Sequence, residues 1–262
     1  MKPLPKLLTA IAVLLLAVTA GIYLQSAPAH DQSTMSAVAK PLLDAVIQNA
    51  KAKHTASVIF LHGLGDSGAG WAGIAPMLAN ALPHVKWIFP NAPVQPVTLN
   101  MGMRMPSWYD IYSLDREQAK QDEKGMLESA SKIQDLINNE VEKHGIPTDR
   151  IVVGGFSQGS AISLLTLVTS PVKLAAIVAL SGYLPLTAKF DDLHKAVNDQ
   201  TPVWMGHGDS DEVVAYKWGL QSAEFLKEKG YSVDFNTYRW MGHSANDQEL
   251  MDLTMFLKNV IP

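Results

Sequence analysis

Short apolar runs alternate with amphipathic stretches along residues 56–262, and this alternation restricts the fold more than any other feature of the sequence. The runs are rich in β-branched and aromatic residues, as buried strands are, and the stretches between them repeat apolar residues at helical spacing. Strands that alternate with helices along one chain form a mainly parallel sheet with helices on both faces. The sequence therefore predicts a single domain of the α/β class.

The elements can be assigned from these patterns. We expect strands over residues 57–61, 85–89, 151–153, 175–180, 202–207 and 232–238, and helices over 71–82, 118–144, 158–169, 216–229 and 245–257. Residues 90–113 follow neither periodicity and contain several prolines and methionines, so they predict a long irregular loop. Such loops often carry function.

The N-terminus differs from the rest of the chain. Lys2 and Lys6 precede an uncharged run over residues 7–24, and Ala27-Pro28-Ala29 follows, which is typical of an export signal with its cleavage site. The run is long for a cleaved signal and slightly short for a membrane span, so an uncleaved anchor is the alternative. Both interpretations predict an exported, periplasmic or extracellular protein, and the second adds membrane association through residues 7–24.

Three parts of the chain follow from these patterns. We expect residues 1–29 to be the signal peptide or anchor, residues 30–55 a linker and lead-in, and residues 56–262 the folded domain.

Composition excludes several classes of function. The chain has 21 Lys and Arg against 25 Asp and Glu, without a basic cluster, so nucleic acid is not an expected partner. It has no cysteine, which excludes disulfides, thiolate nucleophiles and thiolate metal sites. Covalent chemistry must therefore use Ser, Thr, Lys or a carboxylate. We predict no metal and no cofactor, and the sequence does not indicate an oligomeric state.

A serine stands at the junction between an expected strand and an expected helix. It is Ser157 in the pentapeptide Gly155-Phe156-Ser157-Gln158-Gly159, the G-x-S-x-G pattern of a nucleophile elbow. A glycine-rich turn with a capping serine is the alternative. The strand before and the helix after the motif favour the elbow, and so predict the α/β-hydrolase fold with Ser157 as nucleophile.

A serine hydroxyl needs a base to accept its proton, and the base needs an acid that orients it. On this fold the order along the chain is Ser, acid, His. His243 follows the last expected strand and fits this order, whereas His207 has no suitable acid before it. The acid comes from the turn after His207, where Asp211 is favoured and Asp209 is the main rival, since Asp209 can bond to its own turn.

Two backbone N–H groups must stabilise the oxyanion. We expect those of Gln158, directly after the nucleophile, and Leu64, in the turn after the first strand. That turn also matches the dinucleotide pattern G-x-G-x-x-G over residues 63–68. The second strand ends in Phe89-Pro90-Asn91 and not in the acidic residue that binds ribose, so we reject a nucleotide site.

Several motifs in this order resemble the phospholipase/carboxylesterase family, which includes acyl-protein thioesterases and lysophospholipases. The motifs are HGLGD (62–66), FPNAP (89–93), NMGMRMPSWYDI (100–111), GGFSQGS (154–160), HGDSDEVV (207–214) and MGHS (241–244). The resemblance implies Asp211 as the acid and Leu64 and Gln158 as oxyanion donors. The N-terminal segment departs from many members of the family.

The expected loop over residues 90–113 would then border the substrate. Met103 and Met105 are flexible and apolar and can line a groove for acyl chains, as can Trp108, although all three can equally fill the core. We therefore predict a serine esterase for carboxylic esters or thioesters of small-molecule or lipid-like substrates. The alternatives are a peptidase on the same scaffold and a non-catalytic, membrane-tethered binding protein.

Overall fold

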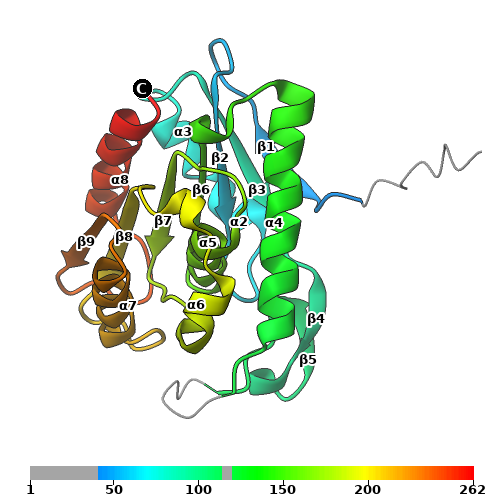
Figure 1. The fold of residues 1–262 in the computed structure, drawn as a ribbon, viewed down its shortest axis with the longest axis vertical. Helices are drawn as coiled ribbons and strands as arrows, with labels where there is room; N and C mark the ends of the chain where they lie inside the picture. Colours follow the sequence, from blue (N-terminus) through cyan, green and yellow to red (C-terminus); the bar gives the residue numbers. More distant parts are fainter. Residues whose placement is uncertain (1–40, 114–119) are drawn as a thin grey trace, which may run out of the picture. The chain divides into compact units, whose positions relative to one another are not determined.

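Seven strands form one sheet in the order β1-β3-β2-β6-β7-β8-β9, in a computed structural model that describes residues 41–113 and 120–262 (Figure 1). The strands are β1 (Ala45–Gln48), β2 (Ala56–Leu61), β3 (Val85–Pro90), β6 (Ile151–Phe156), β7 (Ala176–Leu180), β8 (Val203–Gly208) and β9 (Val233–Tyr238). Only β1 runs antiparallel to its neighbour, β3, and every other pair in this sheet is parallel. The prediction of a mainly parallel α/β sheet is confirmed.

Helices cover both faces of this sheet (Figure 1). One face packs against α4 (Glu123–His144), α5 (Gln158–Thr169) and α7 (Tyr216–Glu228), and the other against α2 (Gly68–Ala72), α3 (Ala75–Leu78) and α8 (Asp247–Val260). Alternate residues of a strand face opposite sides of the sheet. Ile59 of β2 therefore packs on the face covered by α4, α5 and α7, and Phe60 on the face covered by α2, α3 and α8. Burial on both faces explains why the strands read as continuous apolar runs. A short helix, α6 (Phe190–Leu193), follows β7.

Three regions differ from the sequence prediction. The single helix expected over residues 71–82 is two short helices, α2 and α3. Residues 90–113 are not wholly irregular, because β4 (Val94–Val97) and β5 (Met103–Pro106) form a separate two-stranded antiparallel sheet. Pro96 and Pro106 are tolerated there because a two-stranded ribbon has two free edges, where a missing N–H costs no ladder bond. The lead-in before residue 56 contributes β1, a short strand that is only half buried and therefore lacks a strong apolar signal.

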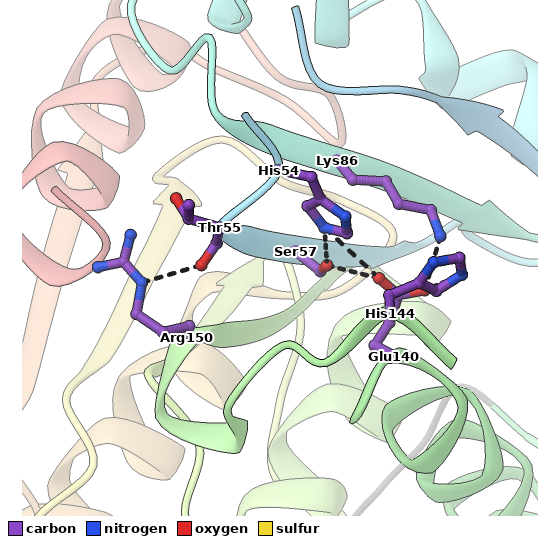
Figure 2. Close-up of polar contacts among 7 residues, drawn as sticks. All are labelled: His54, Thr55, Ser57, Lys86, Glu140, His144 and Arg150. Atoms are coloured by element: carbon purple, nitrogen blue, oxygen red, sulfur yellow. Dashed lines mark hydrogen bonds and ion pairs between the residues drawn. The ribbon is translucent and has the colours of Figure 1, made fainter. Parts of the chain in front are cut away.

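Polar side chains connect α4 to the sheet at the edge opposite the carboxyl ends of the parallel strands (Figure 2). Glu140 of α4 is buried, and its carboxylate lies 2.7 Å from Lys86 Nζ of β3 and accepts the hydroxyl of Ser57 of β2 at 2.6 Å. His54 and His144 lie on either side of the same carboxylate, with Nε2 atoms 3.7 and 3.6 Å from its oxygens. We call these five residues the Glu140 cluster.

Candidate active site

Ser157 lies on a strained turn between β6 and α5. Its φ of 55° and ψ of −115° fall in a region that residues with a side chain rarely adopt. The turn is possible only because glycines stand on both sides of it. A Cβ on Gly155 would lie 2.6 Å from the carbonyl carbon of Gly159, and a Cβ on Gly159 would lie 2.4 Å from the oxygen of Leu61. This close packing leaves the Ser157 hydroxyl at the carboxyl end of the sheet.

The imidazole of His243 bridges Ser157 and Asp211. Its Nε2 lies 2.9 Å from Ser157 Oγ, and its Nδ1 lies 2.7 Å from Asp211 Oδ2. The carboxylate orients the ring with its proton on Nδ1, which leaves Nε2 free to accept the proton of the hydroxyl. The structure thus brings together three residues that are up to 86 positions apart in the sequence.

Asp211 is held as a buried carboxylate. Burial by itself would raise its pKa, but hydrogen bonds from His207 and His243, the charge of His243 and the N–H of Val214 together hold the pKa well below its usual range. His207 Nε2 donates to Val214 O at 2.8 Å and lies 3.4 Å from Asp211 Oδ2. His207 therefore helps to hold the Asp211 side chain, a contact that its position in the sequence does not reveal.

Asp209, the rival candidate for the acid, forms hydrogen bonds within its own turn and to the segment after β9. It is exposed, and its Oδ1 accepts the N–H of Trp240 at 2.7 Å and the hydroxyl of Ser210 at 3.0 Å. These bonds connect the turn after β8 to the segment after β9.

The two expected oxyanion donors lie on neighbouring segments. Gln158 is the first residue of α5, so its N–H has no acceptor within the helix. Leu64 follows Gly63, at which a Cβ would lie only 3.4 Å from the Cβ of Ser157. The turn that carries Leu64 therefore packs directly against the elbow.

His62 holds this turn, although the sequence pattern assigns no role to it. It is fully buried, its Nε2 accepts the N–H of Ala92 at 3.0 Å, and its Nδ1 lies 2.7 Å from the oxygen of Gly63. With Nε2 as acceptor, the single proton is on Nδ1, so the ring is neutral. Burial accordingly lowers the pKa of His62, against smaller opposing effects of the Gly63 carbonyl and Asp66.

The three residues predicted to bind substrate are in different environments. Met103 is 56% exposed, whereas Met105 is half buried. The sulfur of Met105 is 3.8 Å from where a Cβ on Gly65 would lie, in the turn over residues 62–65 that we call the oxyanion turn. Trp108 is 1% exposed and donates its Nε1–H to His62 O at 2.8 Å. In this conformation Trp108 supports the turn from within the core.

A cavity of about 260 Å³ lies between the segment that follows β5 and helix α7. Its lining includes Tyr109, Ile111, Tyr183, Leu184, Trp218 and Phe225. The side chains of Ser157 and His243 are not part of the described lining. Among residues 41–113 and 120–262, no group of three His, Asp or Glu side chains is arranged to hold a metal ion.

Comparison with known proteins identifies the family. Residues 42–261 match the phospholipase/carboxylesterase family. This span covers the whole sheet, and of the described residues only 41 and 262 lie outside it. The chain belongs to the phospholipase/carboxylesterase family.

Relatives of this phospholipase/carboxylesterase include fungal enzymes. Acyl-protein thioesterase 1 of Mycosarcoma maydis is 49% identical over 223 residues, covering 80% of this chain and 93% of the relative. Acyl-protein thioesterase 1 of Neurospora crassa is 48% identical over 221 residues, covering 81% and 90%. The crystal structure of Zea mays acyl-protein thioesterase 2 superposes with a TM-score of 0.75 at 31% identity, covering 84% of this chain and all of that one. The predicted α/β-hydrolase fold and the predicted serine esterase are confirmed.

The expectation of an exported, periplasmic or extracellular protein is wrong. It relied on residues 1–29, which lie outside the family match, and the relatives that share the matched domain are acyl-protein thioesterases of fungi and of Dictyostelium discoideum. Residues 1–29 also lie outside the described residues. Within the described part of this phospholipase/carboxylesterase, no helix is both long and apolar enough to cross a membrane. Membrane association through residues 7–24 stays a prediction.

Proposed function

We propose that this chain hydrolyses acyl thioesters and carboxylic esters in two steps, with Ser157 as nucleophile, His243 as base and Asp211 as the orienting acid. The proposal rests on one observation, the bridge that His243 forms between Asp211 at 2.7 Å and Ser157 at 2.9 Å. This geometry lets a proton leave the hydroxyl as its oxygen bonds to the carbonyl carbon.

The first step forms an acyl-serine. Ser157 Oγ attacks the carbonyl carbon while His243 Nε2 takes the hydroxyl proton, and the tetrahedral oxyanion accepts hydrogen bonds from the N–H groups of Leu64 and Gln158. The imidazolium then protonates the leaving thiol or alcohol, and the bond between it and the acyl carbon breaks. Asp211 remains ionised, because its pKa is held low, and stabilises the imidazolium.

The second step returns the free enzyme. His243 removes a proton from a water molecule, whose oxygen attacks the acyl carbon, and the same two N–H groups again stabilise the oxyanion. The bond to Ser157 Oγ breaks, the serine regains its proton from His243, and the carboxylic acid leaves.

We propose acyl chains joined to a thiol as the preferred substrates, by analogy with relatives named acyl-protein thioesterases. Met105 lies against the oxyanion turn, and Met103 lies on the same strand, β5, with its side chain largely exposed. Unbranched, flexible methionine side chains can adapt to acyl chains of different lengths. Trp108 contributes to binding by fixing the turn beneath them.

The test replaces the nucleophile. Ser157→Ala should lower kcat by at least about 10³-fold on a p-nitrophenyl ester and on a thioester with the same acyl chain, and should abolish labelling by a fluorophosphonate. Ser131→Ala, an exposed serine of α4, is the matched control and should behave as wild type. Turnover of Ser157→Ala near the wild-type rate would refute the mechanism, and a wild-type preference for an alkyl oxygen ester over an alkyl thioester with the same acyl chain would refute the substrate class.

A further inference from the structure

The side chain of Gln158 binds the loop that follows β5. Gln158 is 2% exposed, its Oε1 accepts the N–H of Trp108 at 2.8 Å, and its Nε2 donates to Tyr109 O at 2.7 Å and to Ser107 Oγ at 3.0 Å. Since one backbone partner is a donor and the other an acceptor, the amide has a single favourable orientation. One side chain therefore attaches three consecutive loop residues to the first turn of α5.

The same loop is attached to the oxyanion turn. Pro106 O accepts the N–H of Gly65 at 2.8 Å, and Trp108 Nε1 donates to His62 O at 2.8 Å. These two anchor points lie on either side of Leu64 in the sequence. The side chain of Gln158 therefore holds the loop, and the loop in turn fixes the position of the Leu64 N–H.

Gln158 is thus connected to both oxyanion donors. Its own N–H is one donor, and its side chain, through the loop, holds the turn that carries the other. Oxyanion stabilisation depends on donors that are already in position when the charge develops. We propose that the Gln158 side chain is a positioning residue that sets the separation of the two donors, an inference that rests on the proposed acyl transfer at Ser157.

The first test is Gln158→Met, which keeps the backbone N–H and about the same volume but removes the hydrogen bonds to the loop. We expect kcat to fall between about 10- and 100-fold, because a small displacement of one donor weakens transition-state binding. KM should stay within about threefold of wild type, because ground-state binding does not use the displaced donor.

A second variant gives a readout that a merely structural residue would not affect. In Gln158→Glu the neutral acid can still accept from Trp108 and donate to Tyr109 O, whereas the ionised form cannot donate. The kcat of this variant, divided by that of wild type at the same pH, should rise at least about fivefold between pH 8 and pH 5. This variant also decides the matter if Gln158→Met does not fold.

Gln95→Met is the matched control, since Gln95 Nε2 donates to Ser107 O of the same loop at 2.7 Å but does not reach the elbow. Its kcat should stay within about threefold of wild type. The inference is overturned if Gln158→Met keeps the wild-type kcat, if Gln95→Met loses as much, or if the Glu variant does not recover in acid. If Ser157→Ala is inactive in the same assay, these results overturn only the role of Gln158; if it is active, the proposed function itself fails.

Discussion

Lys86→Met should destabilise the protein strongly, because it leaves the carboxylate of Glu140 buried without its cation. Glu140 is 1% exposed, and its two nearest partners are Lys86 Nζ at 2.7 Å and the hydroxyl of Ser57 at 2.6 Å (Figure 2). Removing one member of a buried ion pair typically costs 3–5 kcal/mol, so we expect a loss of about 3–5 kcal/mol in the free energy of unfolding at pH 8.

The loss should be smaller in acid. Burial lowers the pKa of His54, the charge of Glu140 opposes this, and the charges of Lys86 and His144 lower the pKa further. Without Lys86 the pKa of His54 rises, so a proton bound in acid stabilises the folded variant and restores a positive charge 3.7 Å from Glu140 Oε2. The loss of stability in Lys86→Met should therefore be smaller at pH 5.5 than at pH 8.

Urea unfolding followed by tryptophan fluorescence, at pH 8 and pH 5.5, measures both effects. The double variant Lys86→Met/Glu140→Gln should recover much of the stability, because no charge is then left unpaired. Lys124→Met is the control: its 3.7 Å pair with Glu128 is exposed, and its loss should stay below about 0.5 kcal/mol. A loss below about 1 kcal/mol for Lys86→Met at pH 8, or one that does not depend on pH, would refute the reasoning.

Two further predictions concern other carboxylates. Asp211→Asn should lower kcat by about 10³- to 10⁴-fold on a p-nitrophenyl ester at pH 8, because the amide no longer selects the His243 tautomer. The kcat of the control, Asp209→Asn, should stay within about tenfold of wild type. Equal losses in the two variants would contradict the assignment of Asp211 as the acid. Burial, followed by the charge of Asp252, raises the pKa of Glu249 to about 8, so the wild type loses stability as pH rises from about 4.5 to 8 while the unfolded chain ionises. Glu249→Gln should gain about 3 kcal/mol relative to wild type between pH 4.5 and pH 7 in urea unfolding, and a difference that stays constant with pH would disprove the buried neutral acid.

Local patterns of the sequence predict most of the elements. The strands of the parallel sheet are buried on both faces, so each appears as an apolar run. The helix α5 covers residues 158–169, as its pattern predicts. β1 was not predicted because half of its surface is exposed, and the ribbon of β4 and β5 was not predicted because its prolines resemble those of a loop.

The sequence by itself also pointed to the candidate catalytic residues, because a strand-to-helix junction and a fixed chain order favour Ser157 and His243. It favoured Asp211 as the acid and left Asp209 as the rival. Only the tertiary structure decided which groups support them. These groups act through contacts between distant segments. They are His207, which contacts Asp211, His62, which holds the oxyanion turn, and Gln158, whose amide binds the loop after β5. Such contacts leave no local periodicity, since their partners are brought together by the packing of the sheet and not by spacing along the chain.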